Sequence, residues 1–95
     1  MNQVILRGRI LHVTSNVLPG GNMVHNLELE TIVLNGDVAN VPVLLFEPDI
    51  PNAAMFKADD TVAVTGYVRR RFLRPGSALN SRTEVVAHTI QPHRP

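Results

Sequence analysis

Residues 61–72 read Thr-Val-Ala-Val-Thr-Gly-Tyr-Val-Arg-Arg-Arg-Phe, and this stretch contains the clearest strand pattern of the chain. Small apolar residues recur at every second position in its first half, which is typical of a strand with one buried face. Gly66 lies in the middle of this pattern, and Gly8 lies in the middle of a second one at residues 3–13. Mid-strand glycines weaken a flat sheet and indicate bulges or sharp coiling. The two glycines therefore favour a small closed barrel.

Three more strand patterns follow the same alternation, at residues 23–33, 40–46 and 82–90. Residues 19–22, Pro-Gly-Gly-Asn, form a clear turn signal between the first two strands. Residues 35–37, Asn-Gly-Asp, suit a tight hairpin turn because Asn and Gly tolerate a positive φ. The chain thus contains five predicted strands.

One helical candidate interrupts the strands. Residues 52–58 can hold about two helical turns with Asn52 as the N-cap. Pro42 lacks a backbone N–H, so it places the start of the third strand at a sheet edge or leaves it unpaired. Five short strands with one short helix between the third and the fourth is the order of an OB-fold barrel. The sequence therefore predicts an all-β, five-stranded OB-fold domain over residues 1–91, followed by a short tail at residues 92–95.

The charges are separated along the chain. Residues 67–95 contain six arginines, no lysine and one acidic residue, Glu84, for a net charge of +5. Residues 1–66 contain three basic and seven acidic residues, for a net charge of −4. Arginines beside aromatic side chains and a Pro-Gly loop suit a polyanion whose bases can stack. The alternative is a solvated hairpin end, because natural sheets place basic residues on exposed strands.

The composition excludes several classes of site. The chain has no cysteine, which rules out disulfides and thiolate metal sites. The histidines lack the ligand spacing of a zinc site, and we interpret them as surface or interface groups. No serine has a plausible base and orienting group, and there is no glycine-rich phosphate loop. We therefore expect no catalytic residues, no metal, no cofactor and no enzymatic activity.

The start of the chain bears on localisation. Its apolar stretch is too short for a signal peptide and is broken by Arg7 and Arg9. No apolar run approaches the ~20 residues that span a bilayer. We expect a cytoplasmic protein without a membrane partner.

The strand sequences resemble those of a known family. Residues 1–10, Met-Asn-Gln-Val-Ile-Leu-Arg-Gly-Arg-Ile, are similar to the opening strand of bacterial single-stranded DNA-binding proteins. Residues 24–29, 43–46 and 62–69 resemble the second, third and fourth strands of that family, and residues 82–87 resemble the start of the fifth. The ordered set covers nearly the whole chain, although no single motif is specific. Two departures are the lack of tryptophan, in which the family's stacking positions are rich, and the end of the chain at Pro95, without the family's long acidic-tipped tail. This short form is also similar to primosomal replication protein N.

The resemblance implies a function and partners. It implies binding of single-stranded DNA without strong sequence preference, in replication, repair or recombination. It also implies self-association, as a homodimer or homotetramer, with other replication proteins as further candidate partners. The alternative is an OB-fold assembly module of a replication or primosome complex. An oligosaccharide-binding domain is a weaker alternative, because such domains usually expose more aromatic residues.

The candidate DNA contacts are arginines and aromatic residues. Arginine neutralises phosphates and stacks on bases, and aromatic rings stack on bases. Phe72 falls where the family has an aromatic residue, although it could instead form a small core under the loop. Phe46 and Phe56 are assigned to the core. The candidate DNA-binding residues are Arg7, Arg9, Tyr67, Arg69, Arg71, Phe72, Arg74 and Arg82.

The first strand is the candidate for self-association. Ile5 and Leu11 project opposite the apolar set of this strand, which suggests that it meets a second subunit. Such a contact would also protect an otherwise exposed edge. The candidate interface residues are Val4, Ile5, Leu6 and Leu11.

Overall fold

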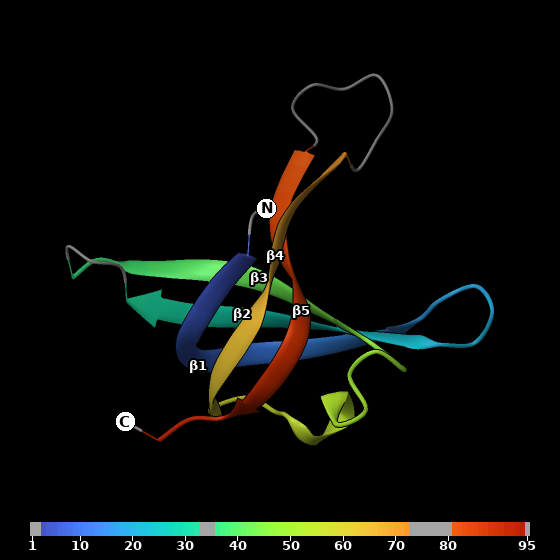
Figure 1. Ribbon diagram of the computed structural model, residues 1–95, viewed down its shortest axis with the longest axis horizontal. Coiled ribbons are helices and arrows are strands. Elements are labelled where there is room, and N and C mark those ends of the chain that lie inside the picture. Colours follow the sequence, from blue (N-terminus) through green and yellow to red (C-terminus); the bar gives the residue numbers. More distant parts are fainter. Residues whose placement is uncertain (1–2, 33–35, 73–80, 95) are drawn as a thin grey trace.

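The strands of this protein close into a barrel. The computed structural model describes residues 3–32, 36–72 and 81–94. The elements are β1 (Gln3–Val17), β2 (Met23–Ile32), β3 (Val38–Phe46), the 3-10 turn η1 (Ala53–Met55), β4 (Thr61–Phe72) and β5 (Ser81–Pro92). Their order around the barrel is β1-β2-β3-β5-β4, and β4 pairs with β1 to close it (Figure 1). The predicted five-stranded, all-β OB-fold barrel is confirmed.

Gly8 is the point at which β1 passes from one neighbour to the other. Residues 3–9 pair with β4, and residues 8–17 pair with β2. A Cβ on Gly8 would lie 2.1 Å from the carbonyl oxygen of Glu30, so no other residue fits. The close approach lets β1 coil sharply enough to serve both sides of the barrel. The interpretation of Gly8 as a coiling position is confirmed.

Gly66 has the same role in β4. A Cβ there would lie 2.2 Å from the carbonyl oxygen of Val86. The register between β4 and β5 shifts between Thr65 and Gly66, as the sequence pattern predicted for a bulge. Both mid-strand glycines are therefore required by backbone contacts across the sheet.

The core fills the barrel with aliphatic side chains from every strand. Fully buried members include Ile10, Leu29 and Val64, and the segment between β3 and β4 adds Ile50 and Phe56 to the same cluster. The assignment of Phe56 to the core is confirmed. Cross-strand apolar contacts of this kind supply most of the stability of a small barrel.

The segment between β3 and β4 is less helical than the sequence predicted. Only Ala53–Met55 forms a 3-10 turn, and Asn52 makes no capping bond; instead its side-chain amide donates to the Ile90 carbonyl at 3.4 Å. Ile50, Ala53 and Phe56 are buried at a spacing of three, which is the period of a 3-10 helix. The need to bury these three side chains at the barrel end outweighs α-helix formation.

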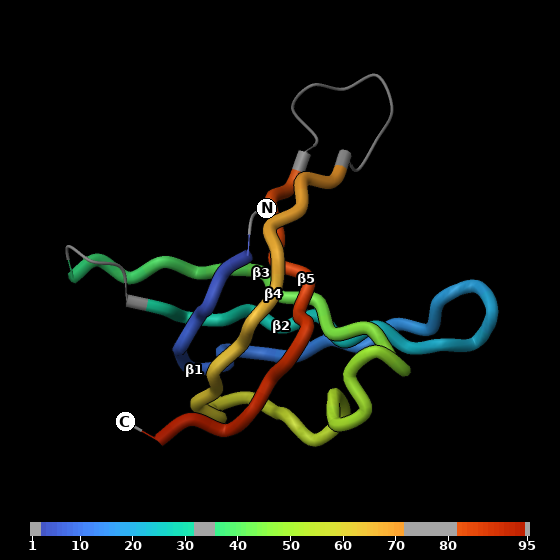
Figure 2. Tube along the Cα trace, viewed as in Figure 1, coloured from blue at the N-terminus to red at the C-terminus, as the bar shows by residue number. Residues whose placement is uncertain are grey.

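Three strands extend beyond their predicted ends: β1 continues to Val17, β3 begins at Val38, and β5 covers Ser81–Pro92. The pairing of β1 with β2 continues to Val17, opposite Met23, so the hairpin projects from the barrel (Figure 2). β3 pairs with β2 over its whole length but with β5 only at Val43 and Leu44. Its first residues, up to Pro42, therefore form an edge, which confirms the prediction made from that proline.

Candidate functional site

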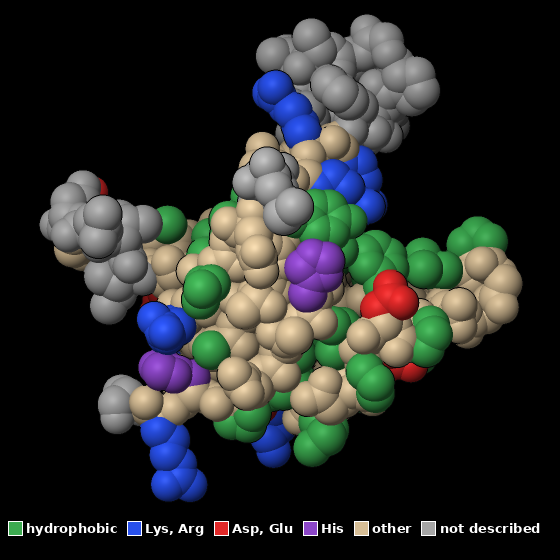
Figure 3. All heavy atoms as spheres, in the orientation of Figure 1, with side chains coloured by type: hydrophobic (Ala, Val, Ile, Leu, Met, Phe, Trp, Pro, Cys, Tyr) green, Lys and Arg blue, Asp and Glu red, His purple; other side chains and the backbone are tan. Residues whose placement is uncertain are grey.

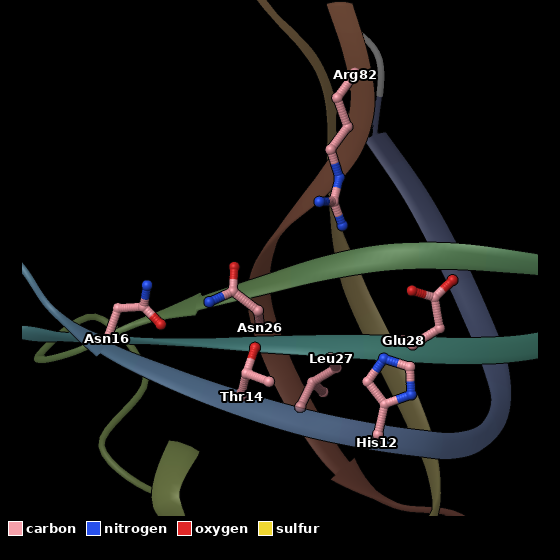
Figure 4. A pocket seen from close by; sticks show the side chains of 7 residues that line it. All are labelled: His12, Thr14, Asn16, Asn26, Leu27, Glu28 and Arg82. Carbon is pink, nitrogen blue, oxygen red and sulfur yellow. The ribbon is translucent and has the colours of Figure 1, made fainter. Parts of the chain in front are cut away.

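An open groove of about 340 Å³ crosses the outer face of β1 and β2. Its lining residues are His12, Thr14 and Asn16 from β1, Asn26, Leu27 and Glu28 from β2, and Arg82 from β5. Figure 4 shows the Arg82 side chain reaching from β5 toward the residues on β1 and β2. Strands distant in sequence thus build one polar surface.

The strand alternation decides which side chains face this groove. Thr14 pairs with Asn26, and His12 pairs with Glu28. Cross-strand partners point to the same face of a sheet, so these four side chains point outward together. The intervening Leu27 points into the core. The polar lining is therefore a consequence of the same register that builds the barrel interior.

The polar groups of the groove are not engaged with one another. Within the described part of the chain, the side chains of Asn16, Asn26, Glu28 and Arg82 make no hydrogen bond or ion pair with another residue. Two amides, a carboxylate and a guanidinium are thus available to an incoming ligand. They supply hydrogen-bond donors and acceptors within one concave surface.

Arginines gather where the β4–β5 hairpin leaves the barrel (Figure 3). Arg71 lies directly opposite Arg82 in the antiparallel register, and Arg70 lies opposite Thr83. Alternation places Arg70 on the other face from Arg69 and Arg71, as the sequence predicted. The groove therefore ends at a basic surface formed by Arg71 and Arg82.

Arg69 is bound to a buried acid. Glu84 has a fully buried side chain (0% exposed), and it lies opposite Arg69 in the register. Arg69 donates to its Oε2 from Nε at 3.1 Å and from Nη2 at 2.5 Å. Arg71 Nη2 lies 3.4 Å from its Oε1. One acid thus offsets part of the charge of two predicted DNA-binding arginines.

Phe46 was assigned to the core, and this assignment is wrong. It is half-buried on the outer face of β3, and the Arg69 guanidinium lies over its ring, 5.8 Å from the centroid. Its cross-strand partner Val24 is buried on the same face, as are Leu44 and Val86 farther along. These apolar residues and Glu84 form a second, smaller packed layer outside the barrel, which a single alternation pattern does not reveal.

Tyr67 is half-buried on the outer face of β4. Its ring lies 5.4 Å from that of His88, with the planes tilted by 42°. His88 is the extra residue of β5 at the register shift, which brings it beside the tyrosine. The pair forms a small exposed aromatic surface, separate from the residues that line the groove.

Arg7 and Arg9, two further DNA-binding candidates, do not line the groove. Arg9 pairs with Asp59 at 2.9 Å and with Glu30 at 3.4 Å, and with Arg7 it lines a different depression beside β4. Arg74 and the side chain of Phe72 lie outside the described residues. Of the six candidates whose side chains the structure describes, only Arg82 lines the groove, and Arg71 lies beside it.

The candidate interface residues divide between two faces. Val4 and Leu6 are partly buried and pack against the core. Ile5 is 65% exposed on the outer face, and Leu11 is half-buried. The edge that the sequence predicted is confirmed in part, since residues 3–7 pair with β4 but not with β2.

His25 was interpreted as a surface or interface group, and it is in fact 5% exposed. Its Nδ1 lies 2.7 Å from Ser15 Oγ, and its Nε2 lies 2.5 Å from Glu47 Oε2. The expectation that Ser15 has no base and orienting group near it is therefore wrong, because His25 and Glu47 lie in the positions of such groups. The network links β1, β2 and the residue after β3, and it satisfies the hydrogen-bonding groups of a buried imidazole.

Residues 3–32, 36–72 and 81–94 contain no cluster of three potential metal ligands. The same residues include no helix that is long and apolar enough to cross a membrane.

Most groove residues were missed by sequence reasoning. Thr14, Asn16, Asn26 and Glu28 are common surface residues, and only the pairing of β1 with β2 brings them together. The available signal was the polar alternation of two strands joined by a tight turn, which predicts that polar residues will share one face.

No protein-family description and no curated protein matches this sequence. Solved structures do match its fold. The dimeric N-terminal domain of PriB from Thermoanaerobacter tencongensis superposes with a TM-score of 0.76 at 17% identity, over 99% of this chain and 98% of that one. A deletion mutant of the single-stranded DNA-binding protein from Thermus aquaticus superposes with a TM-score of 0.71 at 22% identity, over 99% of this chain. This chain spans about half (51%) of the length of the Thermus chain. The resemblance seen in the sequence is thus confirmed at the level of the fold.

Proposed function

We propose that this protein binds single-stranded DNA across the groove on β1 and β2 and along the basic end of β4 and β5. The observation that carries the proposal is the unengaged polar groove with Arg82 above it and Arg71 beside it. Arginines there bind phosphates, and the amides of the groove bind exposed bases. A duplex hides the base edges that pair with one another, so a single strand is the better ligand.

Two features of the comparison support this proposal. One neighbour in fold is itself a single-stranded DNA-binding protein, and the other is PriB. The proposed role is in replication, repair or recombination in the cytoplasm, without catalysis. Contacts to phosphates carry no base information, so they give no strong sequence preference.

We also propose that the protein is a homo-oligomer, at least a dimer, which forms through the first part of β1. Ile5 is exposed there, and within the described part of the chain residues 3–7 pair with β4 and with no second strand. The PriB domain with the same fold is dimeric. Pairing of two such edges would cover both the apolar side chain and the free backbone groups.

The test is a titration of fluorescently labelled oligo-dT, followed by anisotropy at several salt concentrations, beside a duplex of the same length. Binding should favour the single strand and weaken with salt, with a log–log slope near −0.7 per phosphate neutralised. Equal or tighter binding of the duplex would contradict the proposal. Absence of any DNA binding would leave the assembly module as the better hypothesis.

A further inference from the structure

The groove contains a charge that a phosphate-binding surface does not need. Glu28 lies on the outer face of β2 and lines the groove with the two asparagines. Its carboxylate accepts hydrogen bonds only, and it repels phosphate. The part of a DNA strand that lies against Glu28 must therefore donate hydrogen bonds, and in a single strand of DNA the donors are the N–H groups on the base edges.

The bases differ in the donors that they offer to a carboxylate. The Watson–Crick edge of guanine carries two adjacent donors, N1–H and the N2 amino group. Adenine and cytosine carry one amino group beside an acceptor nitrogen, and thymine carries one N–H between two carbonyl oxygens. Only guanine can engage both carboxylate oxygens at once, in the manner of a guanidinium.

Arg82 supplies the complementary group. Figure 4 shows its guanidinium and the Glu28 carboxylate entering the groove from different strands. They form no ion pair with each other. Arginine binds the O6 and N7 acceptors of guanine, which lie on the edge away from N2. The Glu28 carboxylate thus suits the edge of guanine that carries N1–H and N2, and the Arg82 guanidinium suits the edge that carries O6 and N7.

Hydrogen-bonding groups dominate the groove. None of the seven described residues that line it is Phe, Tyr or Trp, and the His12 imidazole and the Arg82 guanidinium are its flat groups. Stacking differs little between bases, so a base preference of this groove must come from its hydrogen-bonding groups. Asn16, Asn26 and Thr14 are placed to bind the sugar and the neighbouring base.

We propose that this groove is a guanine subsite, in which Glu28 accepts hydrogen bonds from N1 and N2 and Arg82 donates to O6 and N7. The inference rests on the proposed binding of single-stranded DNA and adds a local base preference to it. It concerns one position of the bound strand, so general affinity for other sequences remains.

The test uses ligands that differ by one atom or group. Alternating d(GT) is compared by anisotropy with d(IT), in which inosine lacks the N2 amino group, and with an alternating strand in which 7-deazaguanine lacks the N7 acceptor. Oligo-dT of the same length measures general binding. We expect d(GT) to bind about tenfold more tightly than d(IT) and oligo-dT, since a bidentate contact discriminates by about that factor.

Each ligand atom is matched with one side chain. Glu28→Ala should bring the ratio of the affinities for d(GT) and d(IT) close to one. Arg82→Ala should bring the ratio of the affinities for d(GT) and the 7-deazaguanine strand close to one. Glu30→Ala and Arg94→Ala are the controls, and they should keep both ratios. Glu30 lies two residues along the same face of β2 but pairs with Arg9 outside the groove. Far-ultraviolet circular dichroism confirms that each variant is folded.

The outcomes separate this inference from the proposal on which it rests. Equal binding of d(GT) and d(IT), together with tight binding of oligo-dT, overturns the guanine subsite alone. Failure of every oligonucleotide to bind overturns both. Guanosine monophosphate is the competitor that distinguishes a free nucleotide from a base within a strand. If it displaces d(GT) more effectively than unlabelled d(GT) does, the site serves a free nucleotide and the strand assignment is wrong.

Discussion

The Glu84 carboxylate is buried outside the barrel core, and Arg69 is its principal partner. Arg69→Ala would leave this charge buried without the two hydrogen bonds that Arg69 donates. Breaking a buried pair from one side is strongly destabilising, so we expect the free energy of unfolding to fall by about 3 kcal/mol. Urea denaturation measures this value.

Two variants serve as controls for this prediction. Arg70→Ala removes an exposed arginine from the neighbouring position and should change stability by less than about 0.5 kcal/mol. Replacing both Arg69 and Glu84 by leucine removes the unpaired charge and should restore most of the loss. If Arg69→Ala is as stable as Arg70→Ala, the buried pair does not have the role assigned to it. Because of this pair, Arg69 is a poor choice for testing DNA contacts.

Gly8 allows β1 to serve two neighbours, and any side chain there meets the backbone of β2. Gly8→Ala should lower the free energy of unfolding by about 3 kcal/mol, because the carbonyl of Glu30 cannot move away without breaking the ladder. Gly20→Ala is the control: it has a positive φ (+99°) but no atom within 4 Å of the added Cβ. Its cost should be only about 1 kcal/mol. Thermal unfolding of both variants gives the comparison, and equal costs would contradict the steric argument.

At the scale of elements, the basic end of β4 and β5 is expected to set the salt dependence of DNA binding. Arg71 and Arg82 lie opposite each other and beside the groove. Oligo-dT offers no guanine to Arg82, so on this ligand both arginines contact phosphates; their joint replacement by alanine removes two phosphate contacts, and the log–log salt slope should decrease by roughly 1.4. Titrations of oligo-dT at several salt concentrations measure the slope.

The control for this element changes the same charge elsewhere. Lys57 lies in the segment before β4, and Arg94 follows β5. Both segments are at the end of the barrel away from the β4–β5 hairpin (Figure 1). Their joint replacement by alanine should leave the slope nearly unchanged. An equal decrease in both double variants would indicate a general charge effect in place of a defined site.

At the scale of the whole molecule, the free edge of β1 predicts self-association. Ile5→Lys places a charge on the exposed apolar position of this edge and should convert an oligomer to a monomer at tens of micromolar, as measured by sedimentation equilibrium. Val38→Lys is the matched control, because Val38 is similarly exposed (58%) but belongs to β3. A monomeric parent protein would contradict the prediction directly.

The sequence by itself determined the barrel. The alternation of apolar residues predicted the strands, the turn residues predicted where they end, and two mid-strand glycines predicted the coiling. Each of these signals lies within a single strand or turn, so the sequence alone is enough to read it. The charge separation also follows from the sequence alone, and it directed attention to Arg71 and Arg82.

Only the tertiary structure decided which of these residues act together. Strand register joined Asn26 and Glu28 to Thr14 across the hairpin, and closure of the barrel brought Arg82 to them from the other end of the chain. The same closure buried Glu84 beside Arg69, so a predicted DNA contact also became part of a packed layer. Alternation can suggest a shared face for two strands joined by a turn, such as β1 and β2. The position of Arg82 beside them depends on pairing between distant segments, and the local pattern of each strand contains no information about that pairing.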